Sequence, residues 1–203
     1  MSRVVVLAYS GGLDTSVCVK WLAERGDRVI AFMADVGQGE PPASGASPDA
    51  GRTTGGAAAI RRAKIAGASQ VIVRDLRAQF LMDYCWPALQ AHAVYEGHYL
   101  LATALSRPLI ATHLVDVAHR TGARAVAHGC TGKGNDQVRF ELTTRMLDPT
   151  LQIIAPVREW SFRSREEEIA YAKRHRIPID VSTRRPYSID QNLWGTSIES
   201  GAL

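Results

Sequence analysis

The chain has 203 residues, of which 46% are hydrophobic, and its formal net charge at pH 7 is +4. This length supports one substantial core, so we expect one domain with at most a small appendage, and no apolar run approaches the roughly 20 residues that span a bilayer. The first residues lack a secretory pattern, and the three cysteines lack the CxxC spacing of a zinc site, which together favour a cytoplasmic protein without a disulfide framework.

The basic residues form short clusters that lie far apart and lack interleaved aromatic side chains. Solvated helix faces and loops explain these clusters better than a nucleic-acid surface does. We therefore expect small anionic substrates, with neither a nucleic acid nor a membrane as partner.

The first predicted element is a buried parallel strand over residues 4–8, a short β-branched run that ends at a turn. Glycines in the turn at residues 10–12 allow positive φ and the close approach of a ligand. A helix then begins near residues 14–16. A strand, a glycine-rich turn and a helix N-terminus together favour an anion site, although the same pattern occurs in turns that bind nothing. Three hydroxyl groups add donors there, those of Ser10, Thr15 and Ser16.

The next elements complete a βαβ unit. The spacing predicts a helix that ends near Gly26 and a second strand over residues 29–34, parallel to the first. Residues 35–38 follow at the carboxyl end of that strand, where open α/β sheets bind ligands, so Ala34 is a candidate to lie under an adenine ring. Residues 39–56 are rich in Pro, Gly, Ser and Ala and contain no large apolar side chain, which predicts a mobile loop.

The remaining periodicities predict further helices and strands. Helices are expected over residues 57–66, 76–90 and 164–176, another is expected to end near residue 121, and strands are expected over 70–74, 124–128 and 151–155. Pro87 is a candidate break and Pro108 a candidate irregularity in their helices. Three side chains of the 76–90 helix share a face, namely Phe80, Tyr84 and Leu89, and the two aromatic ones are expected in the core. Ser164 opens a capping-box pattern that ends at Glu167, in a helix expected to be solvated.

This alternation of strands and helices predicts an α/β fold. We expect an open, mostly parallel five-stranded sheet with helices on both faces and ligands at the carboxyl edge of the strands.

A second glycine-rich segment, residues 128–141, follows the fourth predicted strand. Its three glycines expose backbone N–H groups to an anion, and Lys133 adds a positive charge suited to phosphate. Asn135, Asp136 and Arg139 then offer an amide, a carboxylate and a guanidinium. Such a set holds a zwitterionic amino acid, with its carboxylate on Arg139 and Asn135 and its ammonium on Asp136.

The first loop, Ser10-Gly11-Gly12-Leu13-Asp14-Thr15-Ser16, resembles the PP-loop of the N-type ATP pyrophosphatases and not a Walker A loop. Together with the second segment it resembles the argininosuccinate synthase family, and the similarity covers most of the chain, including residues 35–38, 99–108 and 186–194. That family activates citrulline with Mg-ATP through citrullyl-AMP, from which the amine of aspartate displaces AMP. The resemblance therefore implies a ligase of arginine biosynthesis with ATP and Mg²⁺ as cofactors, and a sheet of strand order 3-2-1-4-5 like that of the adenine nucleotide alpha hydrolases.

The resemblance also assigns residues to ligands. It implies an ATP site at Ala8, Tyr9, Ser10, Gly11, Gly12, Leu13, Asp14, Thr15, Ser16, Ala34 and Gly129. It implies an aspartate site at Thr131, Asn135 and Asp136, and a citrulline site at Tyr99, Asn135, Arg139, Ser188 and Ser197. The predicted catalytic side chains are Asp14, which by analogy orients Mg²⁺, and Lys133. Catalysis then rests on positioning and charge neutralisation, with little need for a side-chain base.

Three features depart from the family pattern. Family members continue into a further domain that supplies the remaining citrulline contacts and an oligomerising tail, whereas this chain stops at Leu203. The loop at 39–56 is longer than usual, and Ala104 stands where some members have a hydroxyl, which Thr103 is expected to supply. We interpret residues 1–185 as a nucleotide-binding domain and residues 186–203 as the start of a synthetase domain. The expected partner is another copy of the chain or a complementary C-terminal domain.

Two other functions fit the motifs. The chain could adenylate another ureido, amide or carboxyl substrate, or it could be a non-catalytic ATP-binding module. A panel of substrates tested for pyrophosphate release separates these hypotheses from argininosuccinate synthesis. A tRNA-thiolating PP-loop enzyme fits less well, because that chemistry uses paired cysteines.

Overall fold

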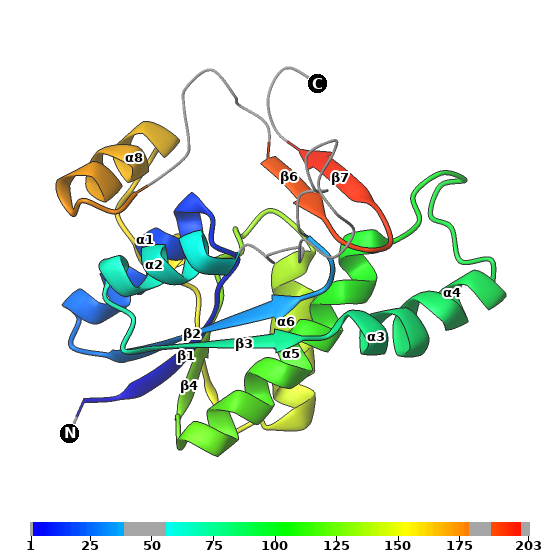
Figure 1. The fold of residues 1–203 in the computed structure, drawn as a ribbon, viewed down its shortest axis with the longest axis horizontal. Coiled ribbons are helices and arrows are strands. Elements are labelled where there is room, and N and C mark those ends of the chain that lie inside the picture. The colour runs from blue at the N-terminus through cyan, green and yellow to red at the C-terminus, as the bar shows by residue number, and fades with distance from the viewer. Residues whose placement is uncertain (1, 39–55, 179–187, 200–203) are drawn as a thin grey trace.

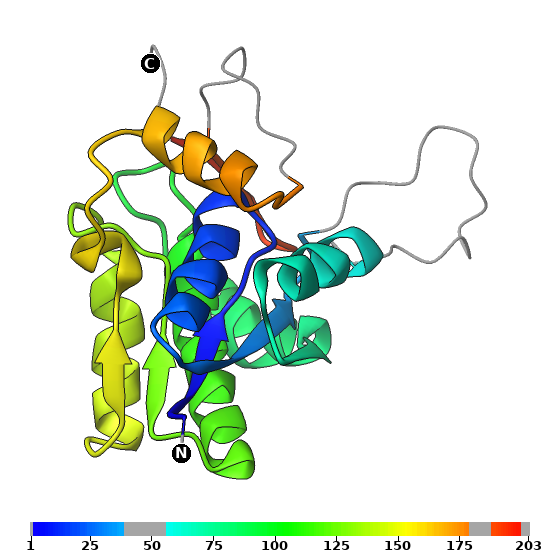
Figure 2. The same cartoon turned by 90° about the vertical axis from the view of Figure 1, so that its left-hand side faces the viewer.

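Five parallel strands form the central sheet of the computed structural model, which describes residues 2–38, 56–178 and 188–199. The strands are β1 (Val4–Ala8), β2 (Arg28–Asp35), β3 (Gln70–Asp75), β4 (Ala125–Ala127) and β5 (Gln152–Ile154). Their order is β3-β2-β1-β4-β5, and all neighbouring pairs are parallel (Figures 1 and 2). The predicted fold class and strand order are confirmed.

Helices cover both faces of this sheet (Figure 1). On one face lie α1 (Leu13–Glu24), α2 (Gly56–Ala66), α7 (Pro156–Glu159) and α8 (Arg165–Arg174). On the other lie α5 (Ala102–Thr121), α6 (Asp136–Leu147) and a segment made of α3 (Arg77–Gln79), η1 (Phe80–Cys85) and α4 (Trp86–Gln90). Throughout the described ranges we find no helix with the length and apolar character that a bilayer crossing requires.

The side chains of β1 explain why its sequence is a continuous apolar run. Successive side chains in a strand point to opposite faces, so Val5 and Leu7 pack beneath α1 while Val6 packs against α5. All three are fully buried. Because helices cover both faces of this strand, none of its side chains points to solvent, and the sequence shows no alternation of apolar and polar residues. The loops that follow the parallel strands all leave from the carboxyl edge of the sheet.

The segment from Arg77 to Gln90 differs from the single helix predicted over 76–90. A π-helical stretch, η1, separates two short α-helices, and Pro87 lies in the first turn of α4 without ending the helical run. The wider π turn shifts the backbone register by one residue, which accommodates a proline ring and its missing N–H. Phe80 is buried as predicted, and Tyr84 is half-buried against the same core, whereas Leu89 on that helix is 52% exposed.

Pro108 lies inside α5, which continues through it to Thr121. The predicted cap of α8 is present, because the Ser164 hydroxyl accepts a hydrogen bond from the Glu167 N–H at 3.3 Å. The Glu167 carboxylate in turn accepts from the N–H of Arg163, one residue before the cap. The helix is not simply solvated, however, because Glu168 is buried against α1.

Neither α6 nor the antiparallel hairpin formed by β6 (Ser188–Gln191) and β7 (Thr196–Glu199) was predicted from the sequence. The hairpin turn is fastened to the carboxyl end of the sheet: the Leu193 N–H donates to the Val36 carbonyl at 2.9 Å. Asn192 donates to the carbonyl of Ala102 at 2.8 Å. The predicted loop at 39–56 lies outside the described residues apart from Gly56, which begins α2.

Candidate active site

The first loop connects the carboxyl end of β1 to α1. Gly11 has a φ of +84°, and a Cβ added there would lie 2.8 Å from the Cβ of Ala59 in α2, so both the backbone and the packing require glycine. Arg62, also in α2, donates a hydrogen bond to the Gly11 carbonyl. Gly12 is the N-cap of α1 and supplies no side-chain cap, so the N–H groups of the first turn are available to an anion.

The hydroxyls of this loop have different roles. Ser16 is fully buried, and its Oγ donates to the Gly12 carbonyl at 2.6 Å and lies 3.0 Å from the Tyr9 hydroxyl. It therefore braces the loop from within. Ser10 is exposed, and its Oγ lies 3.1 Å from Oγ1 of Thr15. Of the three predicted hydroxyl donors, Ser10 is the one that faces solvent.

Three other residues predicted to contact ATP are apolar and lie in or beside the two cores of the sheet. Leu13 and Ala34 are buried, and Ala8 is half-buried at the end of β1. Such side chains offer an apolar surface and backbone groups but no charge. Contacts with a nucleotide at these positions therefore depend on shape and on the backbone.

The second loop begins at the end of β4, the strand beside β1. A Cβ added to Gly129 would lie 3.0 Å from Cγ2 of Thr15, so the two glycine-rich loops pack against each other. Thr131 and Lys133 are exposed beyond that contact. This contact brings together two loops that follow neighbouring strands of the sheet.

The second loop leads into α6, whose N-cap is Asn135. The N-terminus of α6 is thus a second helix end beside the loops, with Asp136 in its first turn. One helical turn later, Arg139 donates to Oδ1 of Asp136 at 2.7 Å. Both side chains are partly exposed. The three residues predicted to bind an amino acid therefore lie on one helix end.

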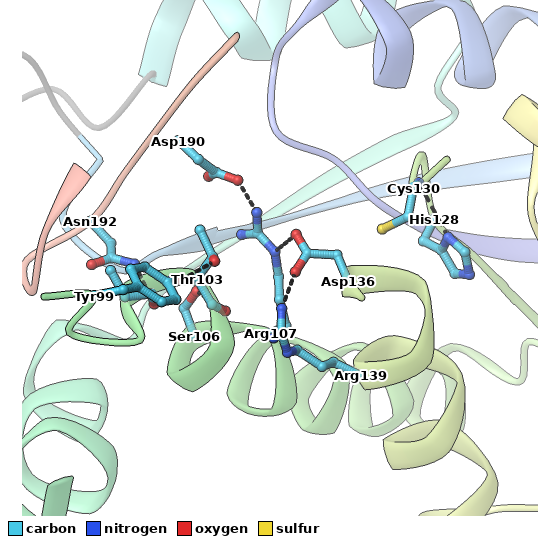
Figure 3. A network of polar contacts seen from close by, with 11 residues as sticks. Tyr99, Thr103, Ser106, Arg107, His128, Cys130, Asp136, Arg139, Asp190 and Asn192 are labelled. Atoms are coloured by element: carbon cyan, nitrogen blue, oxygen red, sulfur yellow. Dashed lines mark hydrogen bonds and ion pairs between the residues drawn. The ribbon is translucent and has the colours of Figure 1, made fainter. Parts of the chain in front are cut away.

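A chain of ion pairs links α6 to the hairpin through Arg107 of α5 (Figure 3). Nε of Arg107 donates to Oδ2 of Asp136 at 2.7 Å, and the same guanidinium donates to Oδ2 of Asp190 in β6. Including the pair between Asp136 and Arg139, two cations and two carboxylates alternate along this network. The charges balance before any substrate is bound.

The predicted citrulline residues lie on three elements around this network. Tyr99 precedes α5, and its hydroxyl lies 2.6 Å from Oγ1 of Thr103. The Thr103 hydroxyl, expected to replace the one absent at position 104, is thus engaged with Tyr99. Ser188 lies in β6, and Ser197 lies in β7 directly opposite Asp190.

Sequence comparisons connect this geometry to known proteins. Residues 4–178 match the model of the "Arginosuccinate synthase N-terminal HUP domain". The chain belongs to the argininosuccinate synthase family. A curated argininosuccinate synthase from Rhodococcoides fascians is 57% identical over 200 residues, covering 98% of this chain and 47% of that protein. One from Aquifex aeolicus is 53% identical over 199 residues, covering 98% of this chain and 46% of that protein. The chain thus spans about half the length of these relatives.

Solved structures share the fold at low sequence identity. A 4-thiouridine synthetase in complex with RNA and ATP superposes with a TM-score of 0.54 at 17% identity, covering 85% of this chain and 40% of that one. A predicted subunit of a tRNA methyltransferase from Methanocaldococcus jannaschii gives a TM-score of 0.54 at 16% identity, covering 84% of this chain and 76% of that one. Both support the α/β architecture.

Asp14, the predicted Mg²⁺ residue of this family member, lies in the first turn of α1 beside Glu168 of α8. Burial, together with the neighbouring Asp14 carboxylate, raises the pKa of Glu168 to about 8. The described residues contain no cluster of three or more His, Cys, Asp or Glu side chains arranged around a metal. A single carboxylate nevertheless suits Mg²⁺, which is commonly held by one or two carboxylates and by substrate phosphates.

His128 forms the inner wall of the second loop. Its Nδ1 accepts a hydrogen bond from the Cys130 N–H at 3.3 Å, and its Nε2 lies 3.4 Å from Oε1 of Glu141. Burial lowers the pKa of His128 and raises the pKa of the Cys130 thiol to about 12. We assign both side chains to shaping the loop, since they carry no charge near neutral pH.

Four side chains near the loops were not predicted from the sequence as functional residues, namely Arg62, Arg107, Glu168 and Asp190. The partners of Arg107 are 29 and 83 residues away along the chain, so local spacing carries no sign of them. The sequence does give one indication for Arg107, because it lies within the 99–108 stretch that resembles the family.

Proposed function

We propose that this chain is the nucleotide-binding part of an argininosuccinate synthase. It would bind ATP on the first loop, activate citrulline by adenylation, and join the activated carbon to aspartate. The contact between Gly129 and Thr15 carries this proposal, because it joins the loop suited to pyrophosphate to the loop that leads into the amino-acid residues. The high identity to curated argininosuccinate synthases supports the same reading.

The proposed reaction has two displacements. The ureido oxygen of citrulline displaces pyrophosphate from the α-phosphate of ATP, and the amine of aspartate then displaces AMP with loss of a proton. Argininosuccinate, AMP and pyrophosphate are the products. Because AMP is already a good leaving group, the protein contributes chiefly alignment and charge stabilisation.

The residues of this chain divide that task. The first turn of α1 would donate N–H groups to the pyrophosphate, with Ser10 adding a hydroxyl donor. Lys133 would balance phosphate charge as it develops. Asp136 would bind the ammonium group of aspartate with help from Thr131 and Asn135, while Arg139 would bind the citrulline carboxylate.

Mg²⁺ would neutralise phosphate charge and polarise the α-phosphate when bound. We assign its protein ligand to Asp14, whose carboxylate lies in the first turn of the helix that meets the phosphates. Further citrulline contacts are assigned to Tyr99, Ser188 and Ser197.

The test is to incubate the chain with ATP, Mg²⁺, citrulline and aspartate, and to measure pyrophosphate and argininosuccinate. Release that depends on both amino acids supports the proposal. Pyrophosphate release with another ureido, amide or carboxyl compound instead would contradict the substrate assignment. ATP binding without release under any condition would identify a binding module.

The aspartate assignment has its own test. Thr131→Ala and Asp136→Ala should each raise the KM for aspartate by about ten- to a hundred-fold, the loss expected for one charge-assisted hydrogen bond. The affinity for ATP should stay close to that of the wild type. An equal loss of aspartate and ATP affinity would contradict the assignment.

We also propose that a partner covers an apolar groove between the η1–α4 segment and the turn of the hairpin. It encloses about 470 Å³ and is lined by Leu81, Met82, Trp86, Leu89 and Trp194. Large exposed apolar surfaces commonly mark interfaces. The partner is a second copy of the chain or a complementary C-terminal domain. The second alternative arises because residues 186–203 are interpreted as the start of a synthetase domain. Sizing chromatography distinguishes these two partners, because only association with a second copy makes this chain a dimer or larger.

A cytoplasmic location is proposed from the cysteine pattern.

A further inference from the structure

Arg107 is the most enclosed member of the ion-pair network beside the proposed amino-acid site. Its side chain is only 15% exposed, and it projects from the middle of the second turn of α5 toward two other elements (Figure 3). One carboxylate that it contacts belongs to α6 and the other to β6. Arg107 therefore connects α6 to the hairpin through these two ion pairs.

A mostly buried guanidinium depends on such partners. Removing a cation from water is costly unless carboxylates with good geometry compensate, and loss of one member leaves an uncompensated charge. The planar fork of arginine suits this position because separate N–H groups can donate to separate acceptors. Arg107 uses Nε for Asp136 and a terminal nitrogen for Asp190, so one side chain fixes both carboxylates.

The two carboxylates lie in different parts of the proposed site. Asp136 is assigned to the ammonium group of aspartate, and Arg107 holds its Oδ2 while Arg139 holds its Oδ1. Asp190 lies directly opposite Ser197 in the hairpin, and residues that face each other in an antiparallel pair share a face of the ribbon. Anchoring Asp190 therefore also sets the position of Ser197, which is assigned to citrulline.

We propose that Arg107 is a positioning residue that joins the two amino-acid pockets into one unit. It orients Asp136 for aspartate and, through Asp190, docks the hairpin that carries the citrulline residue Ser197. The role is structural support of two groups that touch substrate, and Arg107 itself need not touch either amino acid. The assignment of the pockets rests on the proposed function, whereas the docking of the hairpin does not.

Three variants separate the two arms of the network. Arg107→Met removes both contacts with a side chain of similar length. Arg107→Lys keeps the charge but replaces the fork with a single ammonium, and should restore part of the loss. Asp190→Asn weakens only the arm to the hairpin. Arg3→Lys is a matched control. Arg3 precedes β1, outside the proposed site, and its guanidinium makes a similar double contact with Asp27.

The first readout is amide hydrogen exchange, which needs no turnover. Arg107→Met should speed exchange both in β6–β7 and in the first turns of α6, whereas Asp190→Asn should speed exchange in the hairpin alone. The control should change neither region. Unchanged exchange in both regions of Arg107→Met would overturn the proposed docking.

The second readout is steady-state kinetics. Arg107→Met should raise the KM for aspartate and for citrulline by about tenfold each, with the KM for ATP close to that of the wild type. Asp190→Asn should raise mainly the KM for citrulline. A fall in kcat with both amino-acid KM values unchanged would overturn the positioning role. A wild-type chain that makes no argininosuccinate would refute the proposed function and the pocket assignment together, while the exchange experiment still decides the docking.

Discussion

Replacing Gly11 with alanine tests whether the first loop depends on its unusual backbone. The φ of +84° is costly for an L-residue, at about 1–2 kcal/mol. The new Cβ would lie 2.8 Å from the Cβ of Ala59, and overpacking of this kind costs roughly 1–3 kcal/mol. Restricting the unfolded chain offsets about 0.4–1 kcal/mol. We therefore expect the free energy of unfolding to fall by about 2–4 kcal/mol.

Gly12→Ala is the matched control in the adjacent position. Gly12 has an ordinary extended backbone, with φ −77° and ψ −178°, and a Cβ there would meet the Ser10 hydroxyl oxygen at 3.5 Å. Alanine is a weaker N-cap than glycine, but the restricted unfolded chain offsets part of that loss. The free energy of unfolding should change by less than about 1 kcal/mol.

Urea denaturation measures both variants, with the slope m compared to ensure that the same unfolding is observed. Combining Gly11→Ala with Ala59→Gly removes the steric part and leaves the backbone part, so the double-mutant cycle should show favourable coupling. ATP binding by calorimetry should weaken in Gly11→Ala, because the loop can no longer hold its conformation. If the two single variants were equally stable, or if Gly12→Ala were the more damaging, the argument about loop geometry would be refuted.

Three further outcomes follow from buried or capped groups. Because the folded protein raises the pKa of Glu168 from 4.5 to about 8, the folded state keeps a proton that the unfolded chain releases, and the resulting stability is full below about pH 4.5 and lost as the pH rises through 8. Glu168→Gln should remove this pH-dependent contribution to the free energy of unfolding, which is on the order of a few kcal/mol. Urea unfolding of magnesium-free protein between about pH 5 and 9 measures it, and a pH dependence equal to that of the wild type would contradict the raised pKa. Ser164→Ala should lower the free energy of unfolding by about 1 kcal/mol through loss of the α8 cap, and a loss indistinguishable from zero would show that the cap is unimportant. The Cys130 thiol, with its pKa near 12, should react with iodoacetamide at about pH 8 at least tenfold more slowly in the folded than in the urea-unfolded protein. Similar rates would refute the raised pKa.

Local patterns were sufficient for much of the fold and for the first loop. A β-branched run, two glycines and a helical period lie within one short stretch. Each of these patterns favours a particular local backbone conformation. The Ser164 cap followed in the same way from residues three apart. The positive φ of Gly11 fits the expectation drawn from adjacent glycines. These features need no knowledge of the rest of the chain.

Other features depended on neighbours that are distant in sequence. The π turn before Pro87 occurs where η1 packs against α5, a contact that the period of a single helix does not contain. Leu89, which follows it, is exposed. The start of α6 was hidden because its residues were interpreted as a binding motif without a helical period. Glu168 occurs in a run of three acidic residues that looks solvated, yet it is the member that α8 turns toward α1.

The sequence by itself therefore determines the loop chemistry, because the glycines and hydroxyls of each loop are contiguous. The strand order was expected only because the chain resembles a family. The partnership of Arg107 with Asp136 and Asp190 arises only when α5, α6 and the hairpin come together at the carboxyl edge of the sheet. An ion pair depends on distance in space, and separations of 29 and 83 residues along the chain leave that distance undetermined until the chain has folded.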